Sequence, residues 1–546
     1  MTSSKLLAYL RKIPSRSPDF ISTRGSKDKI PFWPSIIQGM ASDGGLLVPV
    51  SIPKLPATWL RDRNFWVNFT PSDLATLIHR LFIPRSEISD SDLAVLIARA
   101  LNFPLPIDQL DPDTFVMRLD RGPTASFKDV AARTLAQLMA AYTTKFDKKI
   151  NIIVATSGDT GVAIADAFGL LPNITVTVLY PDKGVSEIQE KQMLHIHNTY
   201  ANEQAIPIKG NFDNCQDVAK LLQSARYSTG KEGIVFLAKE VAEKLGQKIT
   251  LEQVKKMTKE IGGLDLSSAN SINIWRLIPQ TTQYFAAYRE LIKQNKIKPG
   301  QEVIFSVPTG NVGHLMAGIY AREIGLPIKN FIIGTNANNI IANVIGNGVI
   351  KHRPFKKTSA PSMDILDPSN LERLLAYSAI KTGYRGEINF PAMKTDIKNF
   401  SSESQSKPLS VYGVTPKMIG FLQELIWAED VETDEELYAM MRQTYHKQNL
   451  VLETHGTTGL IATLRARSKG LVDCPVIIFE TAHPDKFATA LVEAGLSKTP
   501  QWKHPIIESL KKRPLGKFNK PLAQGINIIK VAEKIATLTR QQKFSK

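Results

Sequence analysis

A lysine placed for covalent chemistry is Lys128, which lies in the segment Gly122–Asp129 with the sequence GPTASFKD. The apolar run Phe115–Leu119 predicts a strand before this segment, and Val130–Met139 predicts a helix after it. Lys128 then falls in the first helical turn, where the helix dipole disfavours the charged form of an amine. This environment suits a lysine that forms an imine with a carbonyl compound. An exposed surface lysine beside Asp129 fits the same local pattern, so both interpretations are open at this point.

Two further segments have the pattern of anion-binding loops. In Val307–His314 (VPTGNVGH), Gly310 and Gly313 allow successive backbone N–H groups to close around an anion at the start of a predicted helix. The segment Thr156–Gly161 (TSGDTG) offers hydroxyl and N–H groups that suit a carboxylate. Each loop is equally compatible with a plain strand-to-helix turn.

Short apolar runs alternate with helical patterns from about residue 113 onward, which is typical of parallel βαβ units. Ligands of open parallel sheets bind beyond the carboxyl ends of the strands, so the loops after the predicted strands are where a site is expected. The runs that predict buried strands are Ile150–Ala155, Ile174–Leu179, Val303–Val307, Phe331–Gly334 and Val476–Phe479.

The turn sequence Asp111-Pro112-Asp113 predicts the end of an N-terminal domain at residue 112. We expect a smaller α/β domain over residues 113–300, with Lys128, and a larger α/β domain over residues 301–546, with the loop Val307–His314. Residues 223–268 are rich in lysine and glutamate and predict a helical insertion in the smaller domain.

The chain of 546 residues has a formal net charge of +17, but its lysines and arginines are spread along the sequence. The only dense basic run contains few aromatic residues, so it predicts a solvated face rather than a nucleic-acid site. No apolar stretch is long enough for a membrane helix. We therefore expect neither nucleic acid nor a membrane as a partner. The basic run consists of Lys511, Lys512, Arg513, Lys517 and Lys520.

The first 18 residues contain four basic residues and no acid, and Leu6, Leu7 and Leu10 share one helical face. This pattern fits either an organelle transit peptide or a basic helix on the folded domain, and the lack of a following Ser/Arg-rich region favours the helix. The two cysteines, Cys215 and Cys474, have neither a metal nor a redox spacing, which indicates a reducing compartment. We expect a cytoplasmic location, with an organelle as the alternative.

The sequence lacks the standard signatures of several enzyme classes. It contains no GxGxxG, HExxH or GxSxG motif, which argues against a dehydrogenase, a metalloprotease and an α/β-hydrolase. Phe127 stands where a Walker A loop requires a glycine before the lysine. His195 and His197 form a close pair without a third ligand, so no metal is expected.

Together with other segments along most of the chain, these motifs resemble threonine synthases of the longer branch found in enteric bacteria and fungi. So many motifs in the same order rarely arise by chance. The matching segments are Ile21–Gly25, Ala41–Leu46, Gly122–Asp129, Ser157–Gly161, Tyr180–Ser186 with Gln189-Glu190, Gly210–Gln216, Asn270–Asn273 with Arg276 and Gln280, Met363-Asp364 with Pro368–Asn370, and Thr481–Pro484 with Lys486-Phe487.

The resemblance implies an α/β fold of the fold type II pyridoxal 5'-phosphate (PLP) group, similar to the β subunit of tryptophan synthase. Two parallel-sheet α/β domains and an N-terminal domain are expected. It also implies a PLP-dependent carbon–oxygen lyase of threonine biosynthesis. Such an enzyme converts O-phospho-L-homoserine and water to L-threonine and phosphate by γ-elimination and β-addition. The expected assembly is a monomer or a homodimer.

The resemblance further implies roles for individual residues. Lys128 carries the cofactor as a Schiff base, and Phe127 and Asp159 contact it. Thr481 lies beside the pyridine nitrogen and, as a hydroxyl rather than a carboxylate, keeps that nitrogen largely unprotonated. The expected cradle for the cofactor phosphate is Gly310, Asn311, Val312, Gly313 and His314. The residues expected to bind the substrate are Ser157, Gly158, Thr160, Asn270, Ser271 and Arg276, the last because a guanidinium can bind phosphate bidentately.

Three features depart from the family pattern. Glu480 replaces a small hydroxyl residue before Thr481, His314 replaces an acidic or amide residue, and Glu453–Gly459 only partly follows the family's run around its histidine. The carboxyl group of Glu480 is close enough to the expected ring position to affect its electronics. Two other functions therefore remain open. One is a threonine-synthase-like phospho-lyase that gives 2-oxobutyrate, ammonia and phosphate, and the other is a catalytically silent PLP-binding or basic interaction protein.

Overall fold

The structure of the chain is a computed structural model that describes residues 4–169, 171–225, 230–262, 264–351, 353–399, 405–496, 503–514 and 527–541. Its contacts divide the chain into two compact units, each built from segments that are distant in sequence. Unit 1 comprises Met1–Ser35, Met40–Ala131 and Ser271–Trp502. Unit 2 comprises Ile36–Gly39, Ala132–Asn270 and Lys503–Lys546. The division into three consecutive domains at residues 112 and 300 remains a prediction, because compact units in space need not be continuous in sequence.

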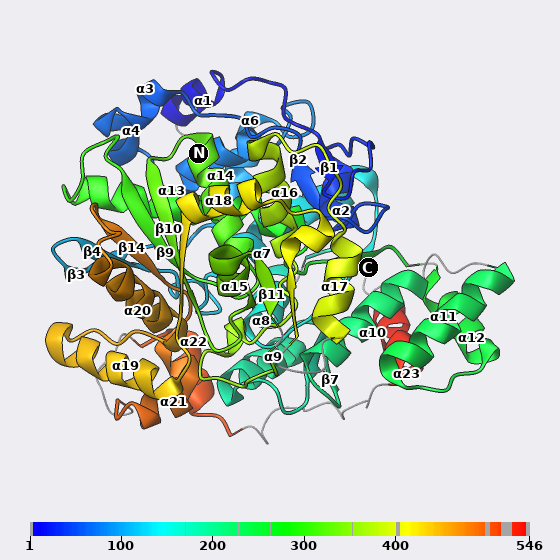
Figure 1. The fold of residues 1–546 in the computed structure, drawn as a ribbon. Helices are drawn as coiled ribbons and strands as arrows, with labels where there is room; N and C mark the ends of the chain where they lie inside the picture. The colour runs from blue at the N-terminus through cyan, green and yellow to red at the C-terminus, as the bar shows by residue number, and fades with distance from the viewer. Residues whose placement is uncertain are drawn as a thin grey trace. The chain divides into compact units, whose positions relative to one another are not determined.

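Unit 1 is built around a six-stranded sheet in the order β13-β10-β9-β14-β4-β3 (Figure 1). Neighbouring strands are parallel except for the antiparallel pair β3 and β4. The central strands are almost continuously apolar and buried, as expected for parallel strands covered on both faces. The strands are β3 Ile107–Asp111, β4 Thr114–Arg118, β9 Val303–Pro308, β10 Ile328–Thr335, β13 Ile426–Asp430 and β14 Val476–Glu480.

Strand β14 pairs with β9 on one side and with β4 on the other. This pairing determines where the loops after these strands lie. In register, Ile478 lies opposite Ser306 and Glu480 lies opposite Arg118. The loops that follow β9 and β14 therefore leave the sheet at the same edge, where a ligand of a parallel sheet is expected.

Three helices pack around this sheet. α20 (Thr454–Ser468) contacts β9, β10, β13 and β14, and α14 (Gly313–Ile324) contacts β9 and β10. α13 (Thr281–Lys293) packs against α14. The Tyr284 ring of α13 makes edge contacts with Phe305 of β9 and Phe479 of β14, with ring centroids 4.8 Å apart in each case. The core of unit 1 therefore reaches the carboxyl ends of the two strands that carry the loops.

The basic N-terminus forms α1 (Ser4–Leu10), which packs on α5 (Pro71–Arg80) and α6 (Asp90–Ala100). Leu6 and Leu10 are buried. The guanidinium of Arg85 donates hydrogen bonds to the carbonyl oxygens of Leu10 and Ile13. The basic segment is therefore part of the folded unit, as the helix interpretation predicted.

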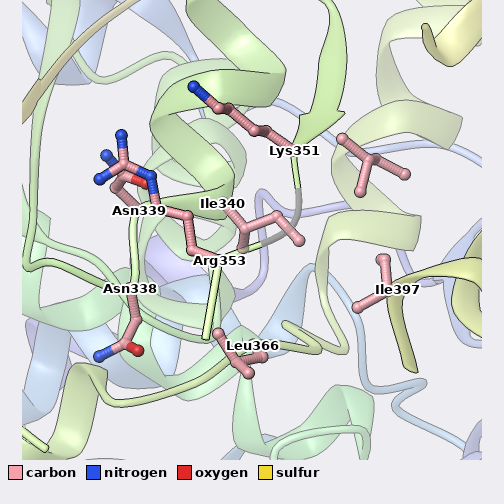
Figure 2. A pocket seen from close by; sticks show the side chains of 8 residues that line it. Asn338, Asn339, Ile340, Lys351, Arg353, Leu366 and Ile397 are labelled. Carbon is pink, nitrogen blue, oxygen red and sulfur yellow. The ribbon is translucent and has the colours of Figure 1, made fainter. Parts of the chain in front are cut away.

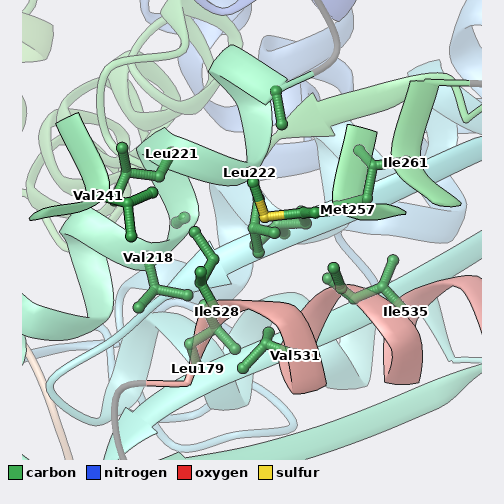
Figure 3. Close-up of a cluster of buried hydrophobic side chains, with 14 of the residues drawn as sticks. Leu179, Val218, Leu221, Leu222, Val241, Met257, Ile261, Ile528, Val531 and Ile535 are labelled. Atoms are coloured by element: carbon green, nitrogen blue, oxygen red, sulfur yellow. The ribbon is translucent and has the colours of Figure 1, made fainter. Parts of the chain in front are cut away.

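Unit 2 contains a four-stranded parallel sheet in the order β7-β6-β5-β8. The predicted insertion forms two helices, α11 (Gly230–Leu245) and α12 (Leu251–Gly262), which pack against α10 (Phe212–Ala225) and α23 (Ile528–Gln541). Their apolar faces form one buried cluster (Figure 3), which includes Val241, Met257, Ile261, Val531 and Ile535. The strands are β5 Ile150–Ala155, β6 Ile174–Pro181, β7 Glu203–Ile208 and β8 Leu266–Ser268.

The remaining elements connect or cover these two frameworks. The α-helices are α2 Phe32–Gln38, α3 Ala57–Leu60, α4 Arg63–Asn68, α7 Lys128–Phe146, α8 Asp159–Phe168, α9 Glu187–Thr199, α15 Ile340–Asn347, α16 Leu371–Thr382, α17 Phe390–Asn399, α18 Pro416–Leu425, α19 Asp434–Gln448, α21 Ala488–Glu493 and α22 Pro505–Lys511. Short strands are β1 Phe20–Ser22, β2 Leu47–Pro49, β11 Val349–Lys351 and β12 Ser406–Pro408. The 3-10 helices are η1 Ile274–Arg276, η2 Ile278–Gln280, η3 Pro361–Met363, η4 Leu409–Tyr412 and η5 Pro484–Phe487.

The predicted parallel α/β architecture is confirmed, and every buried strand named from the sequence is present. Within the described ranges no helix is long and apolar enough to cross a membrane. Lys517 and Lys520 of the C-terminal basic run lie outside the described residues.

Candidate functional site

The segment before Lys128 is attached to the end of β14 by backbone hydrogen bonds. Phe127 N–H donates to the carbonyl oxygen of Thr481 (2.8 Å), and His483 N–H donates to that of Ala125 (3.0 Å). Between them, Ser126 and Ala482 form an antiparallel bridge. Ala125 has a φ of 59°, a left-handed conformation that L-residues rarely adopt. This irregular turn brings the first residue of α7, Lys128, to the edge where β14 ends.

Neighbouring side chains define the surroundings of Lys128. Its Nζ atom lies 4.9 Å from the centroid of the Phe127 ring, a cation–π arrangement. The Phe127 carbonyl accepts a hydrogen bond from Gln283 of α13 (2.7 Å). Asp129 is buried and accepts a hydrogen bond from Thr124 N–H (2.9 Å), so its side chain turns back on the preceding loop. Lys128 is therefore held in a defined turn at the head of a helix and is not simply a surface lysine beside an aspartate.

The loop after β9 has the geometry of an anion cradle. Val312 adopts a left-handed conformation (φ 63°) and caps α14, whose first N–H groups have no acceptor within the helix. Those N–H groups and the helix dipole favour a bound anion. A Cβ atom on Gly310 would lie 2.8 Å from the Cα atom of Met363, so the close approach of that segment requires glycine. The predicted strand–loop–helix arrangement is therefore present.

Polar side chains fix this loop. The Asn311 amide donates to the Ser271 hydroxyl (2.8 Å), and its oxygen accepts from the Ser369 hydroxyl (2.8 Å). The Asn370 amide donates to the carbonyl oxygen of Ser271 (3.4 Å). The structure thus brings Ser271 to the predicted cofactor cradle.

His314 lies in the aromatic core directly behind the cradle. Its ring stacks on Phe127 (centroids 5.0 Å apart) and lies 4.6 Å from Phe479. Burial, together with the charge of Lys128, lowers the pKa of His314 to about 3. Neither ring nitrogen has a hydrogen-bond partner among the described residues, so His314 is a neutral imidazole with unused polar atoms.

A buried carboxylate that the sequence did not predict lies beside Thr481. Glu453, at the N-cap of α20, accepts hydrogen bonds from the N–H groups of His455 (2.6 Å) and Gly456 (3.0 Å). It also accepts from the Thr481 hydroxyl (2.9 Å) and from Nδ1 of His455 (2.6 Å). Burial acts to raise the pKa of Glu453, but its interactions with His455 and Thr481 outweigh burial and lower it.

The pKa of Glu480, whose carboxyl group was expected to affect the electronics of the cofactor ring, is shifted in the opposite direction from that of Glu453. Burial and the nearby charge of Glu453 raise the pKa of Glu480 well above its usual range, which favours the neutral form of its carboxyl group. Its Oε1 accepts a hydrogen bond from the N–H of Glu453 (2.7 Å). Thus the carboxylate that is hydrogen-bonded to the Thr481 hydroxyl belongs to residue 453 and not to residue 480.

Arg276 is also buried in unit 1, at the end of η1. Burial lowers the pKa of its guanidinium to about 10, which leaves the group positively charged at neutral pH. The adjoining helix η2 contacts α14. Arg276 therefore supplies a buried cation in the same unit as the cradle.

The other predicted site residues belong to unit 2. Asp159 accepts a hydrogen bond from Gln189 (3.0 Å), and the Thr156 hydroxyl accepts from Gly158 N–H (2.9 Å) and donates to the carbonyl oxygen of the same glycine (2.9 Å). Gly158 has a φ of 145°, and a Cβ atom there would overlap the Gln189 side chain. The binding roles assigned to Ser157, Gly158, Asp159, Thr160 and Asn270 remain predictions.

The side chains of unit 1 fit pyridoxal phosphate. A lysine amine, a helix N-terminus with a left-handed cap, and a hydroxyl at the end of the neighbouring strand offer groups for its aldehyde, phosphate and ring nitrogen.

Among the described residues no group of three metal-ligating side chains is present. A separate pocket (Figure 2) is lined by Asn338, Asn339, Ile340, Ile350, Lys351, Arg353, Leu366 and Ile397, and none of the predicted site residues lines it.

Comparisons with known proteins agree with the motifs. A family model described as threonine synthase N terminus matches residues 19–101. The chain is 31% identical over 502 residues to a threonine synthase of Schizosaccharomyces pombe, and the match covers 87% of this chain and 89% of that protein. It is 32% identical over 501 residues to the human protein threonine synthase-like 1, with 88% of this chain and 61% of that protein covered.

A solved structure extends the similarity to the fold. The crystal structure of PLP-bound threonine synthase from Brucella melitensis matches with a TM-score of 0.76 at 28% identity, covering 96% of this chain and 100% of that chain. The resemblance seen in the motifs and the expected fold type II architecture are confirmed over most of the chain.

Proposed function

Because this chain belongs to the threonine synthase family, we propose that it converts O-phospho-L-homoserine and water to L-threonine and phosphate. It is a PLP-dependent lyase, and its cofactor is pyridoxal 5'-phosphate. The observation that carries the proposal is the attachment of the Lys128 turn to the end of β14, in the same unit and at the same sheet edge as the cradle after β9.

Within this proposal, the protein holds the cofactor by three separate contacts. Lys128 binds its aldehyde carbon, and the backbone N–H groups of residues 310–314 bind its phosphate. The ring of Phe127, stacked on His314, supplies an apolar surface beside it. When bound, PLP supplies the electron sink for the charge that develops on the substrate carbons.

The side chains then control protons and leaving groups. The Lys128 amine, displaced by the substrate amine, takes the proton from Cα, and a Cβ proton follows. Phosphate leaves from Cγ as hydrogen phosphate, and Cγ gains a proton to become the methyl group. Water then gives its hydroxyl group to Cβ, and Cα is reprotonated to give threonine. Each of these steps depends on orientation, because the competing outcomes differ only in which bond breaks or forms next.

The substrate phosphate requires a buried cation, and Arg276 is our candidate. Its planar guanidinium can form two parallel hydrogen bonds to phosphate oxygens. Ser271 is less free for this role than the motif implied, because its hydroxyl accepts a hydrogen bond from Asn311. We retain it as a candidate, with Asn270, and assign the substrate carboxylate to Ser157, Gly158 and Thr160.

The departures from the family pattern lie near the cofactor site, which keeps a phospho-lyase as a second candidate. His314 and Glu480 are both buried among residues adjoining Phe127 and Thr481. Substitutions at positions 314 and 480 can change the fate of the intermediate that is left after loss of phosphate. Either water adds to it at Cβ, or it is hydrolysed to 2-oxobutyrate and ammonia.

Product analysis distinguishes these outcomes. The full chain is supplied with PLP and O-phosphohomoserine, and threonine, 2-oxobutyrate and phosphate are measured together. We expect threonine and phosphate in equal amounts, with both lost in Lys128→Ala. Formation of 2-oxobutyrate in place of threonine would assign the protein to the lyases. Bound cofactor without phosphate release would support the catalytically silent protein.

We also propose a cytoplasmic location and a monomeric or homodimeric assembly. Burial of Leu6 and Leu10 in α1 supports a structural role for the basic N-terminal segment rather than removal as a transit peptide. Imaging of a C-terminally tagged chain, and light scattering of the purified protein, test these two proposals.

A further inference from the structure

The hydroxyl of Thr481 has only one proton, and it donates that proton to Oε1 of Glu453. The two oxygen atoms are 2.9 Å apart. Thr481 is nearly fully buried, with 7% of its surface exposed. Toward any other group, its oxygen can therefore act only as an acceptor.

The direction of this hydrogen bond follows from the other partners of Glu453. Oε1 also receives the N–H groups of Gly456 and Thr481, and Oε2 receives the N–H and Nδ1 of His455. Nε2 of His455 accepts from the N–H of Ser362 (3.0 Å), so Nδ1 carries the imidazole proton and donates it to Glu453. A carboxyl group surrounded by donors on both oxygens is ionised, and it cannot donate to Thr481.

The other charged groups near this carboxylate do not cancel its charge. Burial and the charge of Glu453 raise the pKa of Glu480, which favours its neutral form, and its Oε1 accepts a hydrogen bond from the backbone N–H of Glu453. Arg118, on the neighbouring strand β4, is paired with Asp120 (2.9 Å). Glu453 therefore keeps a buried negative charge one hydrogen bond away from Thr481.

We propose that Glu453, acting through Thr481, holds the pyridine nitrogen of the bound cofactor in its protonated form. This inference rests on the proposed function and on the role that the family resemblance implies for Thr481, beside the ring nitrogen. A hydroxyl that can only accept requires a donor opposite it, and the protonated ring nitrogen is that donor. Glu453 is thus a positioning residue that makes the ring a stronger electron sink, whereas the presence of a hydroxyl alone predicted an unprotonated nitrogen.

The test is the nitrogen-15 NMR shift of the ring nitrogen in the full-length holoenzyme, prepared with cofactor labelled at that atom. The shift reports protonation directly and does not require turnover. We expect the wild-type protein to show the shift of a protonated pyridine. In Glu453→Gln the shift moves to the unprotonated range, because the hydroxyl is then free to donate to the nitrogen. Thr481→Val gives the same change by removing the acceptor.

Glu480→Gln is the matched control, because it changes the neighbouring buried acid while Glu453, the acceptor of the Thr481 proton, is kept, and its ring-nitrogen shift stays at the wild-type value. An unprotonated nitrogen in the wild-type protein overturns the proposal even if neither variant folds. An unchanged shift in folded Glu453→Gln also overturns it. Threonine formation is measured on the same wild-type sample. Threonine with an unprotonated nitrogen refutes this inference alone, whereas a protonated nitrogen without threonine refutes the proposed function alone.

Discussion

At the scale of single residues, the site depends on close approaches that only particular side chains permit. Gly310 illustrates this, because the neighbouring Met363 segment occupies the space where a Cβ atom would lie. Gly310→Ala should displace the cradle and weaken cofactor binding at least tenfold, about 1.4 kcal/mol. Titration of the apoprotein with PLP, followed by absorbance, measures this affinity.

The matched control is Gly420→Ala in α18, where nothing lies within 4 Å of the added Cβ. It should leave cofactor affinity unchanged and stabilise its helix by up to about 1 kcal/mol. Equal affinities for PLP in the two alanine variants would show that the cradle is not where the phosphate binds.

Glu480 predicts a pH dependence of stability. Its pKa is raised above 4.5 in the folded protein, so wild-type stability falls as pH rises from about 4.5 toward the folded-state pKa. Glu480→Gln lacks this loss, and its amide oxygen can still accept from the N–H of Glu453. The variant should therefore gain stability relative to wild type as pH increases. Urea unfolding at several pH values measures the difference, and a constant difference across pH would contradict the raised pKa of Glu480.

The Lys128 segment and the glycine loops of the candidate site could be located from the sequence. Each is a contiguous motif that directly adjoins a strand with a clear apolar pattern. Glu453 could not be located in this way, because its contact with Thr481 joins positions 28 residues apart in the sequence. The local sequence drew attention to Glu480 and not to Glu453. Only the arrangement in space shows which of the two acids is surrounded by donors and is therefore charged.

At the scale of elements, one buried acid anchors the N-terminal segment to α16. Glu372 is fully buried and accepts two hydrogen bonds from Arg24 (3.0 Å each) and one from Lys394 (2.7 Å). Burial acts to raise the pKa of Glu372, but Arg24 and Lys394 outweigh it and lower the pKa. This anchor gives a structural reason for the Ile21–Gly25 motif, whose arginine makes the ion pair.

Glu372→Gln should lower the free energy of unfolding at pH 7 by about 2 kcal/mol, because charged hydrogen bonds become neutral ones. A lowered carboxyl pKa stabilises the fold above its usual value of 4.5, and this stabilisation is lost as pH falls through the folded-state pKa. The deficit of the variant should therefore shrink in acid. Glu435→Gln, whose side chain is 77% exposed, should change stability by less than about 0.5 kcal/mol and serves as control. Similar effects of both substitutions would argue against the anchor.

Strands could be predicted from the sequence where both faces of the strand are buried. β5 matches its predicted range, and β9 and β14 differ from theirs by one residue, because parallel strands have almost continuous apolar runs. β13 was not predicted, since Glu429 and Asp430 interrupt its apolar pattern at the edge of the sheet. Edge strands carry weaker sequence signals because fewer of their residues are buried.

At the scale of the whole molecule, segments distant in sequence complete each unit. α23 closes the core formed by the helical insertion, although more than 260 residues separate it from α12. Neither periodicity nor composition indicates such a partner, and both helices appear in the sequence only as amphipathic segments. The sequence therefore indicated that the insertion is helical but not which helix packs against it.

Ile535→Ala should destabilise unit 2 by about 2–5 kcal/mol, because the side chain is 1% exposed and its loss leaves a cavity. The backbone amides of α11 and α12 should exchange hydrogen faster in this variant than in the wild-type protein. Ile380→Ala removes the same atoms from a side chain that is 65% exposed and should change stability by less than about 0.5 kcal/mol. Unchanged exchange in both helices would mean that α23 does not stabilise the insertion.

The central claim is that phosphate leaves by elimination and that water then adds to carbon. The most direct measurement is the reaction of O-phosphohomoserine in water enriched in oxygen-18, with mass spectrometry of both products. Carbon–oxygen cleavage predicts oxygen-18 in the threonine hydroxyl and none in the newly released phosphate. Oxygen-18 in the phosphate, together with homoserine, would show simple phosphate-ester hydrolysis and would contradict the account.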